Sequence, residues 1–310
     1  MKHMRSSVGP KWGHSKMLSK NELAQFQEDG YLIVNDLFSP AEVEALRAAA
    51  DDPCVRKQLK ERGADEHCVH LLEITAKHDA FKELARDNRI TSRLAQLIGE
   101  DIQLQHSKLA TKPSKKGAGA FGWHQDFAYF PHSNLDLAAV MVMLDDATPE
   151  NGGMYAVKGS HKLGFLNHTR DGYFGGECLE KQVWEAHPKN VVPLMARAGG
   201  ITIHHALTLH GSPPNHSGRP RRGVVFQYRA SDAYQLADHV WVDTGFQVRG
   251  KPSDRVRCGA FTVELPKFKG RESAFGQPFG NAYVQTGAYA ANWNKDLKAA
   301  PVAQAAVATV

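Results

Sequence analysis

The sequence predicts a mainly β protein with helices toward its N-terminal end. From about Ile102 onward, short apolar runs are separated by Gly, Pro and Asn, which is typical of an all-β sandwich or barrel. Before that point, most segments combine helix N-cap residues with apolar residues spaced as on one face of a helix. The chain has 310 residues and 42% apolar content, so it can bury one large core or two modest ones. Motifs must therefore decide the function.

The helical part begins at Ser19, where Glu22 lies three residues on and completes a capping signal. A short helix through Phe26 is expected, and Gly30 ends it. The next expected elements are a strand at Tyr31–Val34, a helix that opens at Ser39-Pro40, and helices near residues 80 to 98.

The β part contains the apolar runs LDLAAVMVML, GMYAV, GITIHHALTL and RGVVFQYRA, each expected to supply a strand. The stretch 163–188 interrupts this series and is expected to be an ordered insertion over a site. We expect a single domain at residues 19–298, with its β core from about residue 102. A flexible segment, residues 1–18, precedes it, and a tail without an assigned role, residues 299–310, follows it.

Charge and cysteine content restrict the kind of protein. The formal charge of +5 is small and the basic residues are spread out, which argues against a nucleic-acid partner. The four cysteines (Cys54, Cys68, Cys178 and Cys258) form no CxxC pair, so neither a zinc knuckle nor a disulfide framework is indicated. No apolar leader or membrane-spanning run is present. A cytoplasmic protein without a membrane partner is expected.

A metal site is indicated by Trp123-His124-Gln125-Asp126. On an extended segment, residues two apart point to the same face, so His124 and Asp126 can bind one ion. His210, in Leu209-His210-Gly211-Ser212 at the end of an apolar run, is the candidate third ligand. Two imidazoles and one carboxylate form the facial triad of non-haem iron(II), which leaves three positions for a bidentate oxo-acid and O₂.

A lone HxD is weak evidence, because such pairs occur often by chance on surfaces and in turns. Arg221 strengthens the assignment, since it opens the strand after His210 and a guanidinium suits the distal carboxylate of 2-oxoglutarate. Arg219 and Arg222 are rivals; strand alternation puts Arg219 and Arg221 on one face. Lysines at 108, 112, 115 and 116 could meet an anionic group near the mouth of the site, although a solvated basic loop explains them better.

At these residues the chain resembles the phytanoyl-CoA dioxygenase family of iron(II)/2-oxoglutarate oxygenases. The resemblance covers roughly residues 19 to 235 and runs through several motifs in the family's order. These are His106-Ser107-Lys108-Leu109, His124-Gln125-Asp126 with Tyr129-Phe130-Pro131, Asp136-Leu137, Asn151-Gly152-Gly153, Val157-Lys158-Gly159-Ser160-His161-Lys162, His205, His210-Gly211-Ser212 and Arg221.

The resemblance implies a double-stranded β-helix, a jelly-roll and cupin-like barrel with helices packed outside. It implies that His124, Asp126 and His210 bind Fe(II). Arg221 would bind 2-oxoglutarate, and Gln125, Ser212 and Lys108 are further candidate contacts for it. The implied reaction uses O₂ and 2-oxoglutarate to hydroxylate or otherwise oxidise a C–H bond of a small molecule, with release of succinate and CO₂.

The chain departs from the family pattern at Gly199-Gly200, where the family often has Gly-Asp; little catalytic effect is expected. Asp126 is retained, whereas related halogenases replace it by Gly or Ala, so halogenation is disfavoured. Gly117–Gly122 satisfies GxGxxG but leads straight into the metal strand, which indicates a loop and not a dinucleotide site. Among the other histidines, His205 is expected nearer the site than His204, and His161 is expected to be structural.

Two alternatives stay open at this point. One is a cupin-like isomerase or hydrolase that uses zinc at the same ligands, and the other is a non-catalytic member of the family. The sequence does not identify the substrate or the oligomeric state. The lysines named above are compatible with an anionic substrate.

Overall fold

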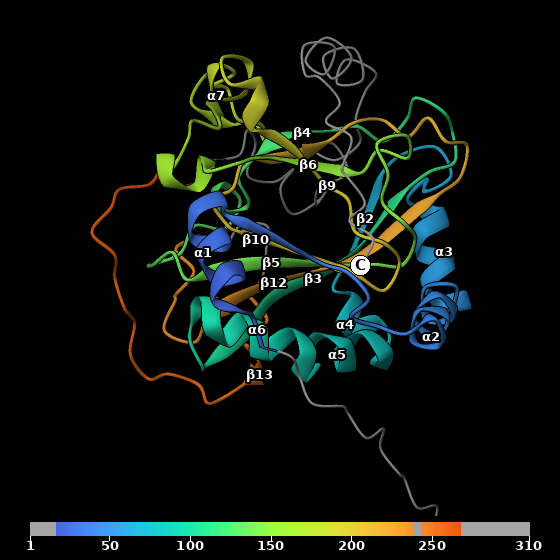
Figure 1. Ribbon diagram of the computed structural model, residues 1–310, viewed down its shortest axis with the longest axis horizontal. Coiled ribbons are helices and arrows are strands. Elements are labelled where there is room, and N and C mark those ends of the chain that lie inside the picture. Colours follow the sequence, from blue (N-terminus) through green and yellow to red (C-terminus); the bar gives the residue numbers. More distant parts are fainter. Residues whose placement is uncertain (1–16, 238–242, 268–310) are drawn as a thin grey trace, which may run out of the picture.

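The computed structural model describes residues 17–237 and 243–267, and it contains two antiparallel β-sheets with helices packed on the larger one (Figure 1). The helices are α1 (Lys20–Asp29), α2 (Pro40–Ala50), α3 (Pro53–Glu61), α4 (Ile74–Lys77), α5 (Asp79–Ala85), α6 (Asn88–Ile98) and α7 (Gln182–Glu185), with the 3₁₀ helices η1 (Asp126–Ala128), η2 (Ser160–Leu163) and η3 (Pro188–Asn190). None of the helices in these ranges is both long and apolar enough to cross a bilayer.

The strands build a large sheet, a small sheet and a two-stranded hairpin. The large sheet has the order β1 (Tyr31–Val34), β10 (Ile201–His205), β5 (Leu137–Met143), β12 (Arg221–Ala230), β3 (Ile102–Lys112) and β13 (Phe246–Arg249), and β2 (Val69–Leu72) also pairs with β3. The small sheet has the order β4 (Phe121–His124), β11 (His210–Ser212), β6 (Met154–Val157) and β9 (Val191–Leu194). The hairpin is β7 (Thr169–Arg170) with β8 (Tyr173–Phe174).

The first helix forms as the sequence predicts, although it is longer. The Ser19 hydroxyl accepts a hydrogen bond from the Glu22 backbone, and the Glu22 carboxylate accepts one from the Ser19 backbone. Ser39 and Glu42 form the same capping box at the start of α2. Helix α1 continues past Phe26 to Asp29, and Gly30 ends it with φ +81°, a left-handed conformation that favours glycine.

Strand alternation gives the large sheet two different faces. On β12, Val224, Phe226 and Tyr228 point toward the helices and join the main apolar core. The intervening side chains of β12 point into the space between the two sheets. Helices α2 to α6 cover one face of the large sheet, and the small sheet lies over the other (Figure 1). The face between the sheets is the one that can carry polar chemistry.

The predicted boundary at residue 102 does not separate helices from strands. Strands β1 and β2 come from the helical part of the chain and pair with β10 and β3 of the large sheet. Strand β2 and helices α3 and α4 were not expected. Leu18, assigned to the flexible segment, is buried and exchanges two backbone hydrogen bonds with the Gln96 side chain. Residues 1–16, 238–242 and 268–310, including the tail 299–310, lie outside the described residues.

Candidate metal centre and cosubstrate pocket

A cavity lies between the two sheets and is lined by side chains of both. The space between its lining side chains is about 560 Å³ when the open solvent at its mouth is included. The large sheet contributes basic side chains from β3 and β12, whereas the small sheet contributes the predicted histidines. The candidate residues lining it are His124, Asp126, His210, Ser212, Lys108 and Arg221.

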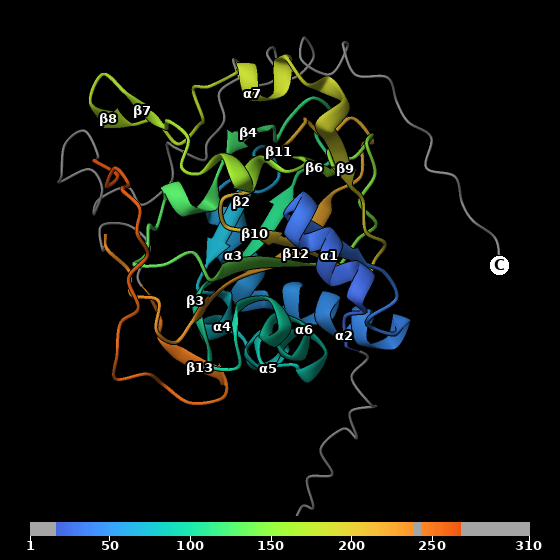
Figure 2. The same cartoon turned by 60° about the vertical axis from the view of Figure 1, so that its left-hand side comes forward.

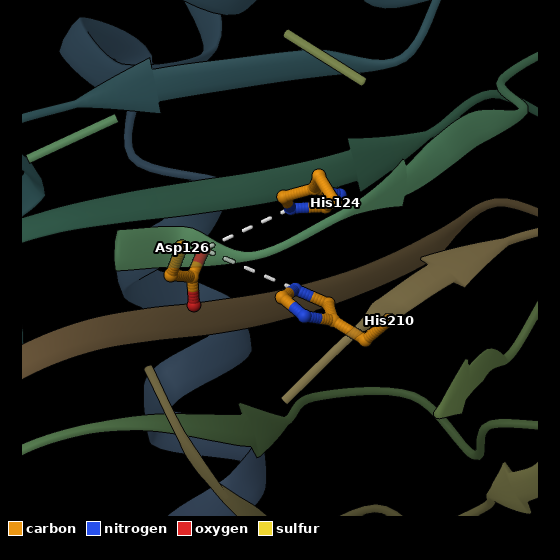
Figure 3. Close-up of side chains that lie close together, drawn as sticks. All are labelled: His124, Asp126 and His210. Atoms are coloured by element: carbon orange, nitrogen blue, oxygen red, sulfur yellow. Dashed lines mark ion pairs between the residues drawn. The ribbon is translucent and has the colours of Figure 1, made fainter. Parts of the chain in front are cut away.

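His124, Asp126 and His210 converge in this cavity, as Figure 3 shows. One ligand atom from each residue lies within 4.8 Å of the others. The Asp126 Oδ1 atom lies 3.7 Å from His124 Nε2 and 3.9 Å from His210 Nε2. The two histidines sit opposite each other in the antiparallel pair of β4 and β11, with ring centroids 4.2 Å apart. Cross-strand register thus supplies two of the three ligands.

Each of these histidines is oriented by a backbone carbonyl. His124 Nδ1 donates to Gly122 O at 2.8 Å, and His210 Nδ1 donates to Thr208 O at 2.9 Å. This places the proton on Nδ1 and leaves the Nε2 lone pair free to bind a metal, an arrangement common among metal-bound histidines. The geometry therefore fits a divalent ion that accepts two imidazoles and a carboxylate.

The protonation states fit the same ion. Burial lowers the pKa of His124 to about 4, and burial together with the nearby His124 lowers the pKa of His210 well below its usual range. Burial alone would raise the pKa of Asp126. His210 and the hydrogen bond from His204 outweigh it, so the pKa of Asp126 stays well below its usual range. At neutral pH the site thus offers two neutral imidazoles and a carboxylate.

The strands that carry these ligands differ from the prediction. Strand β10 ends at His205, and His210 begins β11 in the other sheet, so His210 does not end the apolar strand. The chain crosses between the sheets at residues 206–209, where Thr208 Oγ1 donates to Gly30 O and Leu209 N donates to Ser160 Oγ. Asp126 lies at the start of η1 and not within β4, but Gln125 keeps an extended backbone, so His124 and Asp126 still point to one side.

Gln125 points away from the cavity because of this alternation. Its side-chain amide donates to Gly164 O and Leu207 O, and its carbonyl accepts from Leu166 N, all at 2.8 Å. The side chain is fully buried and its hydrogen-bonding groups are occupied. Gln125 does not line the cavity in this structure, and its contact with 2-oxoglutarate stays a prediction that the geometry does not favour.

Arg221 is the arginine that enters the cavity. It is buried; Nη1 donates to Gly152 O at 2.7 Å, and Nε has no hydrogen-bond partner. Burial lowers the pKa of Arg221 to about 10, so the guanidinium stays charged at neutral pH. Of its rivals, Arg219 is exposed and Arg222 forms ion pairs with Asp145 and Asp51.

Two residues that orient Asp126 were not selected from the sequence. His204 and Gln227 donate hydrogen bonds to Asp126 Oδ2, whereas His205, expected nearer the site, accepts from Leu207 N and packs against Phe26. Gln227 lies six residues after Arg221 on β12, and this even spacing could have identified it.

His161 bonds to Gln27 O, outside the triad. Residues 117–120 form a loop that leads into β4, as expected, and Gly122 already lies in the strand.

The insertion at residues 163–188 is ordered, but it does not line the cavity. Helix α7 lies on the side of the small sheet that faces away from the large one (Figure 2). Trp184 stacks on Trp123 at 5.6 Å, and Cys178 N donates to Trp123 O. The insertion thus packs against the metal strand β4 from outside, and none of its residues lines the cavity.

Comparison with known proteins agrees with this site. The profile of the phytanoyl-CoA dioxygenase (PhyH) family matches residues 26–223, well over half of the chain. A probable alpha-ketoglutarate-dependent hypophosphite dioxygenase of Stutzerimonas stutzeri is 31% identical over 229 residues, which cover 68% of this chain and 79% of the relative. The chain belongs to the phytanoyl-CoA dioxygenase family. The expected class, an iron(II)- and 2-oxoglutarate-dependent dioxygenase, is confirmed at this level.

Other members of the family and solved structures extend the comparison. An ectoine dioxygenase of Sphingopyxis alaskensis is 26% identical over 72% of this chain and 79% of the relative. The crystal structure of EctD from S. alaskensis with 2-oxoglutarate and 5-hydroxyectoine aligns with a TM-score of 0.58 at 24% identity, covering 84% of this chain and 92% of that one. The carbocyclase SnoK from nogalamycin biosynthesis aligns with a TM-score of 0.59 at 24% identity, covering 76% and 94%. These likenesses confirm the double-stranded β-helix fold.

Proposed function

We propose that this protein oxidises a small anionic molecule, with Fe(II) held by His124, Asp126 and His210 and with 2-oxoglutarate as cosubstrate. The observation that carries the proposal is a buried triad with both Nε2 atoms turned inward, beside the buried Arg221, whose Nε has no hydrogen-bond partner within the described part of the chain. A zinc isomerase or hydrolase would have no need of that arginine. The intact triad argues against a non-catalytic member of the family.

Arg221 is the proposed partner of the distal carboxylate of 2-oxoglutarate. A carboxylate there would give Arg221 the counter-charge that its surroundings lack, through short charge-assisted hydrogen bonds. Ser212 lies two residues after His210 and lines the same cavity, where its hydroxyl can donate to the same ligand. This assignment makes Arg221 the main determinant of cosubstrate affinity.

Iron bound in this site would supply the activation of O₂ that is coupled to the decarboxylation of 2-oxoglutarate to succinate and CO₂. The protein's own contribution is to hold and orient. The two histidines present fixed Nε2 atoms, Asp126 presents one oxygen, and the buried walls keep bulk water away from the reacting groups.

The charges around the cavity favour an anionic substrate. A ferrous ion, Asp126, a 2-oxoglutarate dianion and Arg221 sum to zero formal charge. Lys108 and Lys112 also line the cavity, and burial lowers the pKa of both. Lys112 donates to Pro213 O at the Arg221 end, whereas Lys108 interacts electrostatically with Asp126 at the metal end. A substrate anion near the iron would meet a basic side chain there and favour its protonated form.

The relatives supply two contrasting test compounds. Hypophosphite, named for the Stutzerimonas relative, is a small monoanion, whereas ectoine, named for several others, is a zwitterion. Anaerobic titration of the protein with iron(II) and 2-oxoglutarate should first give the weak visible charge-transfer band of the chelate. Succinate release should then be stimulated more by small oxyanions or carboxylates than by ectoine or by uncharged analogues of the same anions. A protein that forms the band but prefers the neutral compounds would refute the substrate class alone.

The cytoplasmic location expected from the cysteine pattern is part of the proposal. It is supported by the free thiols at Cys54, Cys68, Cys178 and Cys258, which form no disulfide among themselves.

A further inference from the structure

The second carboxylate oxygen of Asp126 is held by two side chains outside the triad. His204 Nε2 donates to Oδ2 at 3.0 Å, and Gln227 Nε2 donates to the same atom at 2.7 Å. Both side chains are buried, with exposed fractions of 2% each. Oδ1, by contrast, is the oxygen that faces the two ligand histidines. The two oxygens of one carboxylate thus have separate tasks.

The register of the large sheet creates this arrangement. His204 on β10 and Gln227 on β12 both pair with Ala139 on β5, the strand between them. Residues directly opposite in an antiparallel pair project on the same face, so the three side chains stand in one row. The methyl group of Ala139 is the short member of that row. The carboxylate of Asp126 reaches the row from the other sheet and meets the longer side chains on either side.

His204 and Gln227 also use only their donor groups, both toward Asp126. His204 Nδ1 and Gln227 Oε1 are buried and have no hydrogen-bond partner among the described residues. Buried polar atoms are usually satisfied, and leaving two acceptors bare costs stability. Among the described residues, the hydrogen bonds to Asp126 are thus the side-chain hydrogen bonds that His204 and Gln227 make.

We propose that His204 and Gln227 are positioning residues that restrict Asp126 to one-oxygen coordination of the iron. With Oδ2 occupied by two donors, only Oδ1 is available to the metal. A carboxylate that bound through both oxygens would take a fourth coordination position, whereas 2-oxoglutarate and O₂ together need three. The pair therefore keeps the metal face open. The inference rests on the proposed iron site.

The test compares His204→Phe and Gln227→Met with matched variants. His204→Gln keeps an N–H near the position of Nε2 and should restore binding. His205→Phe, on the same strand but turned away from Asp126, is the control for the histidine. Gln103→Met on β3, whose side chain bonds to Gln247, is the control for the glutamine. Thermal unfolding of each metal-free protein identifies any variant that fails to fold.

Anaerobic iron(II) titration should show a dissociation constant roughly tenfold higher or more for His204→Phe and for Gln227→Met, in line with other residues that orient metal ligands. The 2-oxoglutarate charge-transfer band should shift in both variants, and the controls should match the wild type. Folded variants that bind iron like the wild type would overturn the inference. A wild-type protein that binds no iron would instead refute the proposed function. Independently, ¹⁵N NMR of the metal-free protein should show the His204 proton on Nε2. A proton on Nδ1 would contradict the hydrogen bond from His204 to Asp126.

Discussion

Arg221 and Lys112 face each other across the antiparallel pair of β12 and β3, and both are buried. Within residues 17–237 and 243–267, no carboxylate lies within 4 Å of either side chain. Burial, together with the neighbouring charge of Arg221, lowers the pKa of Lys112 well below its usual range, and the buried charge of Arg221 costs stability because its desolvation is not offset. An anion that enters this end of the cavity would remove the conflict. The pair therefore links cosubstrate binding to the stability of the fold.

We expect Arg221→Met to weaken 2-oxoglutarate binding by roughly tenfold or more, since a hydrogen bond to a charged group contributes about 1.5 to 3 kcal/mol. The same change should leave the free energy of unfolding of the metal-free protein unchanged or higher, because it removes a buried unpaired charge. Anaerobic titration and urea unfolding measure the two effects. Arg222→Met is the control: it removes the ion pair with Asp145 and should leave 2-oxoglutarate affinity as it was. Equal losses in both variants would contradict the assignment.

His210→Ala should abolish the stabilisation that iron gives the protein. Wild-type protein at an iron(II) concentration 100 times its dissociation constant should gain about 2.7 kcal/mol in free energy of unfolding. Because His210 supplies one of three ligands, the variant should show almost none of this gain. Anaerobic thermal unfolding with and without iron(II) measures it. An undiminished gain in the variant would mean that the metal binds elsewhere.

Lys108→Met should raise the KM for an anionic substrate by roughly tenfold, because a charge-assisted contact is lost at the metal end of the cavity. Lys115→Met is the matched control, since Lys115 is exposed and pairs with Glu66 on the surface. Steady-state succinate release measures both variants, and Lys108→Arg tests for rescue. If the affinity for 2-oxoglutarate falls and the substrate KM does not, Lys108 belongs to the cosubstrate site, as the sequence predicted.

Acid should destabilise the metal-free protein through His168. Burial lowers the pKa of His168 to about 4, against about 6.5 in an unfolded chain. Its Nδ1 donates to Leu166 O and its Nε2 accepts from Gln125 N, so protonation would break the second bond. Between pH 6.5 and 4 the unfolded state binds a proton that the folded state does not. Stability therefore rises with pH in this window and is lost as pH falls through it.

The size of this effect follows from one proton. His168 should contribute a slope of up to about 1.4 kcal/mol per pH unit, and His168→Asn should remove that part of the slope. Urea unfolding of both proteins at several pH values between 4 and 8 measures it. Above pH 7 the stabilities of the two proteins should differ by a constant. A slope that is identical in both proteins would show that His168 is not the group responsible.

The sequence was sufficient for the metal ligands because their chemistry restricts them to few residue types, and His124 with Asp126 share a local spacing. It also predicted that Arg221 and not Arg222 faces the cavity, since the strand that carries them is long and regular; the contact of Arg221 with 2-oxoglutarate stays a prediction. The sequence did not predict which of His204 and His205 points toward the site. Residues 206–209 cross between the sheets, so the alternation of side chains along β10 does not continue to His210. The orientation of Gln125 could not be predicted, because a motif shows which residues are adjacent but not which way each side chain points.

The side chain of Gln125 bonds only to main-chain atoms, at Gly164, Leu166 and Leu207. The segment 163–188 is therefore attached to the middle of the ligand motif by its backbone at Gly164 and Leu166, and by the His168 side chain, which accepts from Gln125 N. Its sequence is free to diversify elsewhere as long as that backbone path and His168 are kept. A chimaera that carries a foreign loop here should assemble an intact metal centre if the loop presents a carbonyl, an amide and an imidazole at these points, and should lose it otherwise.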